Sequence, residues 1–360
     1  MEASASRPVV ALPAGLAEIG ARVEERVDEL LAAELERWSE VAPELDAPLS
    51  ALRALVANGG KRLRPAFCFW AFVGAGGAPD DQRITDVASA IELLHAFALV
   101  HDDVMDGSAV RRSAPTVHTS FAASHRARGA RGEARRFGEG AAILVGDFAF
   151  VYSSQLLGVD APPSIRRLYD ELRIELCVGQ YLDLAGSAHG SRRRADAELI
   201  ERYKSGKYTV ERPLHLGAAL AGRLDDLGAS FSRFGIPLGE AFQLRDDLLG
   251  VFGDPDITGK PVGDDLREGK LTPLIAAAVS GAVRPEHLDA LARIGDADLD
   301  SAGVDAIRTA LIETGAVDEV EAAIARRVGD ALDVLDDLAI TSDARDALAE
   351  LARFVAWRDH

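Results

Sequence analysis

The chain has 360 residues, of which 48% are hydrophobic, 27% charged and 6% aromatic. This composition is typical of globular proteins and excludes collagen-like and disordered classes. The 40 basic and 58 acidic residues give a formal net charge of −18, which argues against nucleic acid as a partner because phosphate contacts need clustered cations. Cys68 and Cys177 stand far apart, so we expect neither a disulfide framework nor a zinc site.

Residues 1–15 predict a flexible tail. They lack the basic segment of a signal peptide, and their short apolar run is broken by Pro13. We expect no apolar stretch to reach the roughly 20 residues that a membrane-spanning helix needs. We therefore expect a cytoplasmic protein without integral membrane association, in which residues 16–360 form one domain.

From Leu16 to Trp38, apolar residues recur at helical spacing and charged residues fill the other face, which predicts an amphipathic helix that stops before Pro43 and Pro48. The same periodicity predicts helices over 82–105, 139–158, 164–185, 196–221, 226–252, 303–338 and 343–357. Alternating segments rich in β-branched residues are scarce. The sequence therefore predicts an all-α fold, a helical bundle.

Three segments interrupt the helical pattern. Residues 123–140 hold five arginines and four glycines, and we expect a solvated, mobile loop there. A second break falls at 186–195. The third, GDPDITGKPVGDD at 253–265, is rich in glycine, proline and aspartate and predicts a functional loop.

Two aspartate clusters follow apolar helical segments: Asp102, Asp103 and Asp106 in HDDVMD, and Asp246 and Asp247 in LRDDLLG. Helix positions i, i+1 and i+4 share one side, so the first three carboxylates can converge. Carboxylates at a buried helix end repel one another unless cations compensate them, and hard oxygen ligands suit Mg²⁺ bridged to phosphates. A lone DDxxD could equally be a solvated helix end. The second cluster favours a diphosphate held between metal ions.

Several basic residues stand close to glycines or to the aspartate clusters. Lys61 and Arg64 follow a Gly-Gly pair that lets the backbone approach an anion, and we expect them to share one helix face. The others are Arg111, Arg112, Lys204 and Lys260. Each alone is most often a surface charge. Together with the aspartates they indicate two anion sites, one metal-bound and one held by lysine and arginine alone.

Five motifs, GGKRLRP, HDDVMD…RR, GQYLDL, KSGKYT and FQLRDDLLGVFGD…TGK, occur in the order found in the trans-polyprenyl diphosphate synthases, which the chain resembles over about residues 16–357. The resemblance implies a single-domain, antiparallel helical bundle around a deep central cavity (the isoprenoid synthase fold) and a homodimer. It also implies Mg²⁺-dependent, head-to-tail condensation of isopentenyl diphosphate with an allylic diphosphate (dimethylallyl, geranyl or farnesyl).

The same resemblance assigns residues to roles. The direct magnesium ligands would be Asp102, Asp106 and Asp246. Asp103 would support the first two, and Asp247 and Gln243 would lie beside Asp246. Isopentenyl diphosphate would be held by Lys61, Arg64, His95 and Arg112. The allylic diphosphate would be bound by Arg111, Lys204, Ser205 and Lys260, in a cavity also lined by Gln180 and Asp183. The catalytic set is then the five aspartates with Lys204 and Lys260. Taken alone, His95 would be an ordinary core histidine.

The expected chemistry needs no protein nucleophile, and no Ser-His-Asp or Cys-His arrangement is evident. Cations neutralise the departing diphosphate. The double bond of isopentenyl diphosphate attacks the allylic carbocation, and an apolar cavity excludes water. In the family, the departing diphosphate is thought to take up the proton that is lost.

Product length depends on residues upstream of the first cluster, where the growing chain meets its helix. Phe97 precedes Asp102 by five residues, about 7.5 Å along a helix, and Ala98 beside it is small. One aromatic at this position resembles geranylgeranyl-forming enzymes, so we expect geranylgeranyl diphosphate, with farnesyl or longer products as alternatives. Phe97 could instead be ordinary core packing, with cavity depth set near Phe148.

One departure from the family pattern is Gly250, which stands where the second cluster often has a third aspartate. Two other functions come into question. A terpene cyclase would not need the second anion site, and its second metal motif does not match DDLLGVFGD. A non-catalytic regulatory subunit would be expected to lose aspartate or basic residues that this chain keeps.

Overall fold

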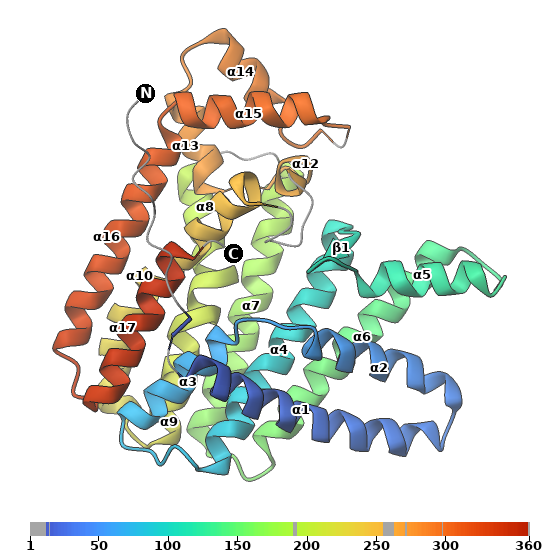
Figure 1. Ribbon diagram of the computed structural model, residues 1–360, viewed down its shortest axis with the longest axis vertical. Coiled ribbons are helices and arrows are strands. Elements are labelled where there is room, and N and C mark those ends of the chain that lie inside the picture. Colours follow the sequence, from blue (N-terminus) through green and yellow to red (C-terminus); the bar gives the residue numbers. More distant parts are fainter. Residues whose placement is uncertain are drawn as a thin grey trace. The chain divides into compact units, whose positions relative to one another are not determined.

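The computed structural model describes residues 12–13, 15–189, 193–254, 263–270, 272–296 and 298–358. Within these ranges the secondary structure is helical, apart from one short antiparallel ladder of β1 (Val110–Arg111) and β2 (Ala114–Pro115). The predicted all-α class is therefore confirmed (Figure 1).

The chain falls into two compact units. The amino-terminal unit comprises Gly15–Leu168 and Pro213–Leu224, and the carboxy-terminal unit includes Tyr169–Arg212 and Asp225–His360.

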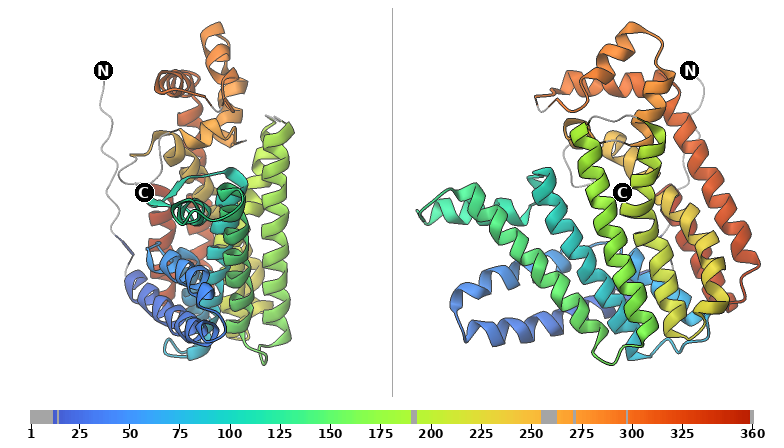
Figure 2. Two further views of the ribbon diagram at one scale, coloured as in Figure 1. Left: turned by 90° about the vertical axis from the view of Figure 1, so that its right-hand side faces the viewer. Right: turned by 180° about the vertical axis from the view of Figure 1, so that it is seen from behind.

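The amino-terminal unit is built around one long apolar helix, α4 (Gln82–Asp106), on which α1, α3 and α6 pack. Its other elements are α1 (Leu16–Ser39), η1 (Pro43–Leu45), α2 (Asp46–Ala57), α3 (Leu63–Gly74), α5 (Val117–Ala127), α6 (Ala134–Leu157) and most of α9 (Arg212–Leu220). Figure 2 shows α4 and α6 running side by side. Ile84, Ile91 and Leu94 of α4 are fully buried, so this helix forms the core of the unit.

Local sequence explains where α4 begins and ends. Asp81 caps its amino terminus by accepting a hydrogen bond from the Arg83 amide at 2.9 Å. Gly107 ends the helix in the left-handed conformation (φ 69°), and its N–H donates to the Asp103 carbonyl. The glycine cap therefore fixes the aspartate cluster in the last turn.

The carboxy-terminal unit contains the remaining helices of the described ranges. They are α7 (Pro163–His189, whose first residues belong to the other unit), α8 (Arg194–Ile200), the π-helix η2 (Glu201–Glu211), α10 (Leu224–Phe252), α12 (Asp264–Arg267), α13 (Pro273–Gly281), α14 (Pro285–Ala292), α15 (Ser301–Glu313), α16 (Ala316–Asp336) and α17 (Ser342–Trp357). The buried Arg245 joins three of them: from α10 it donates to Glu321 of α16 at 2.9 and 2.6 Å and to the Ala356 carbonyl of α17 at 2.6 Å.

Several predicted boundaries are wrong. Residues 123–140 are mostly helical, because α5 runs to Ala127 and α6 begins at Ala134. The segment 303–338 is two helices, separated where Gly315 adopts a left-handed conformation (φ 78°). By contrast, α1 ends at Ser39, before Pro43 and Pro48, as expected. Pro48 itself lies in the first turn of α2, where a proline is tolerated because it lacks an N–H.

The expectation that no segment is long and apolar enough to cross a membrane is also wrong. By length and composition, α4 and α6 both satisfy that criterion. The most apolar window of α4 is 67% buried, as in a core helix of a soluble protein, whereas that of α6 is 39% buried.

Candidate active site

The first aspartate cluster occupies the last turn of α4. Asp102 and Asp106 are half-buried and lie one helical turn apart, while Asp103 is buried. Arg111 of β1 donates to Asp103 Oδ1 through Nε at 2.8 Å, and its Nη2 lies 3.5 Å from Asp102 Oδ2. Burial alone would lower the pKa of Arg111, but the neighbouring carboxylates, led by Asp103, raise it. Asp103 is thus held by an arginine, beside Asp102 and Asp106.

The hairpin that follows α4 directs its two arginines apart. Arg112 and Ser113 occupy the two turn positions between β1 and β2, both with positive φ (51° and 61°). That conformation suits a two-residue hairpin but strains residues other than glycine and asparagine, and strain of this kind is often found at functional sites. Arg111 thus bonds the aspartate cluster, whereas Arg112 Nη1 bonds the Gly59 carbonyl of another loop.

A group of cations surrounds His95 on α4. Arg64 Nη1 lies 3.4 Å from His95 Nε2. Burial lowers the pKa of His95 well below its usual value, and the nearby charges of Arg64, Arg112, Arg111 and Arg62 lower it further, so the imidazole is neutral at pH 7. Burial and neighbouring arginines also lower the pKa of Arg112. This concentration of positive charge can hold an anion.

Lys61 and Arg64 do not share a helix face, contrary to our expectation. Helix α3 begins at Leu63, so Lys61 lies in the preceding loop and Arg64 in the first turn. Gly59 and Gly60 both have positive φ (83° and 146°), and a Cβ at Gly60 would lie 3.0 Å or less from the guanidinium groups of two arginines. The Gly-Gly pair therefore makes room for arginine side chains.

Sequence reasoning missed Arg62, which is buried and left-handed (φ 48°). Its guanidinium donates to Glu92 at 2.5 Å and to Glu24 at 2.9 Å. The signal was present in the α4 sequence, since a glutamate inside the apolar run ASAIELL requires a buried cationic partner.

The second aspartate cluster lies near the end of α10. Gln243 donates to Asp247 Oδ1 at 2.8 Å, whereas the buried Oδ2 accepts no hydrogen bond from the part of the chain that the structure describes. Burial raises the pKa of Asp247 to about 8, and the charges of Asp265, Asp246 and Asp183 contribute. Asp246 accepts a hydrogen bond from Arg358, another residue that sequence reasoning missed.

Gly250 has a structural explanation. A Cβ at this position would lie less than 3.0 Å from the carboxylate of Asp265, which belongs to α12. This carboxylate occupies the space that a larger side chain at position 250 would need. Asp265 also raises the pKa of Asp247 through its charge. A third carboxylate is therefore present beside the second cluster, although it comes from another helix.

The predicted allylic-diphosphate residues of the carboxy-terminal unit gather around η2. Lys204 on η2 donates to Asp183 on α7, Gln180 lies on that helix one turn earlier, and Ser205 follows Lys204. All four are at least half-buried. Lys260 lies outside the described residues.

Both clusters offer hard oxygen donors, which fit Mg²⁺. Beside burial, the carboxylates of Asp265 and Asp246 raise the pKa of Asp247, whose Oδ2 has no hydrogen-bond partner among the described residues. A divalent cation would relieve the repulsion between these carboxylates. Among the described residues, no group of three or more His, Cys, Asp and Glu side chains could by itself hold a metal. Magnesium sites commonly complete their shell with substrate phosphates and water.

Phe97 faces α6 rather than standing alone. Its ring lies 4.6 Å from that of His101 and 4.9 Å from that of Phe150, measured between ring centroids. Sequence reasoning missed Phe150. Phe148, the alternative depth residue, stacks on Tyr152 with centroids 6.0 Å apart.

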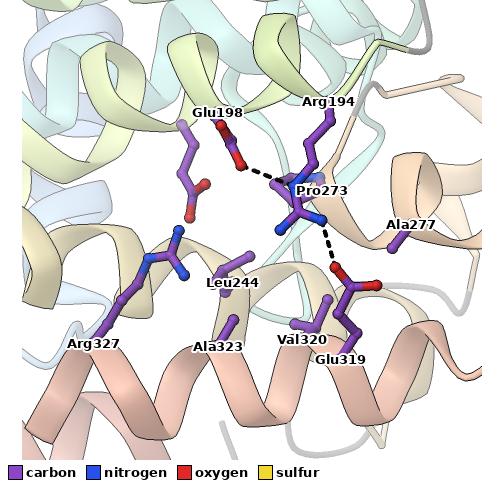
Figure 3. Close-up of a pocket in the computed structure, with 10 residues that line it drawn as sticks. Arg194, Glu198, Leu244, Pro273, Ala277, Glu319, Val320, Ala323 and Arg327 are labelled. Atoms are coloured by element: carbon purple, nitrogen blue, oxygen red, sulfur yellow. Dashed lines mark hydrogen bonds and ion pairs between the residues drawn. The ribbon is translucent and has the colours of Figure 1, made fainter.

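A pocket in the carboxy-terminal unit is not part of this arrangement. It lies between α8, α10, α13 and α16, and the residues predicted for the site do not line it (Figure 3). Arg194 crosses it and pairs with Glu198 at 2.9 Å and with Glu319. Ion pairs therefore already satisfy much of its polar lining.

Comparison with known proteins gives one consistent result. The model of the polyprenyl synthetase family matches residues 47–310. A geranylfarnesyl diphosphate synthase of Aeropyrum pernix is 32% identical over 84% of this chain and 92% of its own length, and a geranylgeranyl pyrophosphate synthase of Geoglobus acetivorans is 30% identical over 94% and 96%. The crystal structure of a Corynebacterium glutamicum geranylgeranyl pyrophosphate synthase, complexed with isoprenyl diphosphate and magnesium, is similar with a TM-score of 0.90, 37% identity and coverage of 95% and 99%.

Proposed function

Because this chain belongs to the polyprenyl synthetase family of prenyltransferases, we propose that it condenses isopentenyl diphosphate with allylic diphosphates and releases geranylgeranyl diphosphate. The observation that carries the proposal is the end of α4. Three aspartates with one compensating arginine stand there, and further arginines surround the neutral His95 on the same helix. One element thus presents a carboxylate site and an anion site.

The two substrates would bind by different means. Isopentenyl diphosphate keeps its diphosphate throughout the reaction and needs only charge neutralisation. Arg64 and Arg112, which lie near His95, would supply it together with Lys61 of the loop before α3. The allylic diphosphate must lose its diphosphate. We assign Asp102, Asp106 and Asp246 as magnesium ligands, because Mg²⁺ prefers carboxylate oxygens and commonly bridges one or two carboxylates to substrate phosphates.

The chain's own residues bind and orient the substrates. Mg²⁺, when bound, neutralises the negative charge that develops on the departing diphosphate. Lys204 donates hydrogen bonds to that group, while Arg111 holds Asp103 in place. The allylic C1–O bond breaks and its electron pair leaves with the diphosphate. The double bond of isopentenyl diphosphate then forms the new C–C bond, and the departing diphosphate takes up the proton that is lost.

Geranylgeranyl diphosphate is our proposed product because relatives that share most of the chain's length carry this product in their names. The Aeropyrum pernix relative is named for a longer product, geranylfarnesyl diphosphate, which makes longer chains the first alternative. Farnesyl diphosphate is the other. Phe97, supported by Phe150, is our candidate for the residue that limits chain length.

We further propose a cytoplasmic homodimer that forms through the apolar face of α6. Ile143, Leu144 and Val151 are exposed along this helix, and a second copy would bury them. Sedimentation equilibrium tests this proposal, since replacement of Leu144 and Val151 by glutamate should yield monomers. A wild-type monomer would contradict it.

Transfer of labelled isopentenyl diphosphate into organic-soluble product, in Mg²⁺ or EDTA, tests the activity. Asp102→Asn and Asp246→Asn should each lower kcat at least a hundredfold, because removal of one group that stabilises developing charge commonly costs 10²–10³ in rate. Asp160→Asn, at an exposed position of the amino-terminal unit, is the matched control and should keep full activity. Absence of condensation by the wild-type chain would favour the regulatory-subunit alternative, and cyclised products would favour a terpene cyclase.

A further inference from the structure

One face of α7 carries three residues at spacing four: Glu175, Gly179 and Asp183. Positions i, i+4 and i+8 of a helix lie one above another, so the three form a stripe. All three contact the same segment. Asp183 accepts a hydrogen bond from Lys204, a Cβ at Gly179 would lie less than 3.0 Å from the Lys204 backbone nitrogen, and Glu175 accepts a hydrogen bond from Lys207. The stripe therefore fits α7 closely against η2.

The segment that this stripe contacts is unusual, because η2 is a π-helix over Glu201–Glu211. Runs with i→i+5 hydrogen bonds are rare and normally last a single turn, so surrounding contacts must hold one of eleven residues. A second glycine helps on the other side. A Cβ at Gly239 of α10 would lie less than 3.0 Å from Gly206 of η2. Glycines on α7 and α10 thus allow both helices to approach the π-helical backbone.

Glu175 is the charged anchor of this arrangement. Arg212, which follows η2 directly, donates to it twice, from Nε to Oε2 at 2.6 Å and from Nη2 to Oε1 at 2.7 Å, and Lys207 Nζ donates to Oε1. Glu175 is buried. Burial raises its pKa, but the hydrogen bonds from Arg212 and Lys207 outweigh burial and lower it, so Glu175 is ionised at neutral pH.

The Lys207 side chain also lies close to two other residues of η2. Its Nζ lies 3.8 Å from Glu211 Oε2 and 5.3 Å from the centre of the Tyr203 ring. Lys204, three residues earlier, contacts Asp183 at the other end of the stripe. The lysines of KSGKYT thus differ in role, since one belongs to the proposed substrate site and the other to the contact with Glu175.

We propose that Glu175 is a positioning residue that holds η2 in its π-helical form through Lys207 and Arg212 and thereby sets the position of Lys204 for the allylic diphosphate. If η2 relaxed to α-helical hydrogen bonding, its residues would rewind by about one position, or about 100° around the axis. Lys204 would then turn away from Asp183. That Lys204 binds the allylic diphosphate rests on the proposed function. The structural role of Glu175 does not depend on it.

The kinetic test uses the full chain with Glu175→Gln, which keeps the size of the side chain and removes its charge. We expect KM for the allylic diphosphate to rise at least tenfold and KM for isopentenyl diphosphate to stay within twofold, with partial recovery in Glu175→Asp. The matched control is Asp170→Asn on the same helix, which removes one carboxylate from an exposed pair with Arg173 and should change neither constant. Equal rises in both KM values would mean that Glu175 supports the fold in general rather than the position of Lys204, and would overturn the proposal.

Hydrogen exchange of the peptides that cover Glu201–Glu211 tests the proposal without substrate. Glu175→Gln should speed exchange there at least tenfold and leave α16 and α17 unchanged, whereas unaltered exchange would refute the proposal. If wild-type protein proves inactive with every allylic diphosphate, this measurement still decides the role of Glu175. If Glu175→Gln does not fold, Lys207→Met keeps the pair with Arg212 and should show the same change to a smaller extent.

Discussion

The buried ion pair of Arg62 and Glu92 allows us to predict how much stability is lost when one partner is removed. The Arg62 and Glu92 side chains are 2% and 6% exposed and join α4 to the turn before α3. Arg62→Met leaves the Glu92 carboxylate buried without its cation, and breaking such a pair from one side costs about 3–5 kcal/mol. Arg53 and Asp28 form a bidentate pair in the same unit, but they are 41% and 50% exposed. Arg53→Met should therefore cost much less stability than Arg62→Met, because water screens an exposed pair.

Urea unfolding followed by circular dichroism measures both losses. The double variant Arg62→Met, Glu92→Leu should regain most of the stability that Arg62→Met loses, because apolar residues of similar volume can replace a buried pair at little cost. Equal destabilisation by Arg62→Met and Arg53→Met would refute this prediction, and so would a double variant that is less stable than Arg62→Met alone.

Three further predictions concern other parts of the molecule. Gly179→Ala should destabilise the protein by about 1–3 kcal/mol and raise KM for the allylic diphosphate, because the added Cβ meets the Lys204 backbone. Gly329→Ala, in open space on α16, should instead stabilise the protein by about 0.5–1 kcal/mol. Thermal unfolding of the two variants compares these effects. The pKa of His95 is depressed in the folded state, so below about pH 6.5 the unfolded chain binds a proton that the folded chain does not. The free energy of unfolding should therefore decrease as the pH is lowered, by up to about 1.4 kcal/mol per pH unit. Unfolding of His95→Gln across pH 5–7 should lack that dependence. Phe97→Ala should lengthen the product, and an unchanged chain length would show that Phe97 only packs the core.

Much of the fold could be predicted from the sequence because helical periodicity is local. The apolar spacing from Leu16 to Trp38 and the predicted helix at 82–105 correspond closely to α1 and α4. The predicted helix boundaries were wrong where a single residue determines the end of a helix. Gly315 divides α15 from α16 through a left-handed backbone, and nothing in the apolar spacing of 303–338 requires that break.

Candidate site residues could be identified where motifs are local, but their partners could not. Asp246 belongs to a short motif, whereas its partner Arg358 is 112 positions away. The carboxylate beside Gly250 likewise comes from α12. Such pairings depend on how helices pack, and no local spacing encodes them. The π-helix at η2 was missed for the same reason, since it depends on glycines and a carboxylate that neighbouring helices supply.

The proposed activity is tested most directly by incubating the protein with isopentenyl diphosphate and each of dimethylallyl, geranyl and farnesyl diphosphate, with and without Mg²⁺. The alcohols are then identified after dephosphorylation. We predict a twenty-carbon alcohol that forms only in the presence of Mg²⁺. A different chain length would keep the prenyltransferase and contradict the proposed product. No elongated product from any of the three starters would contradict the proposed activity itself.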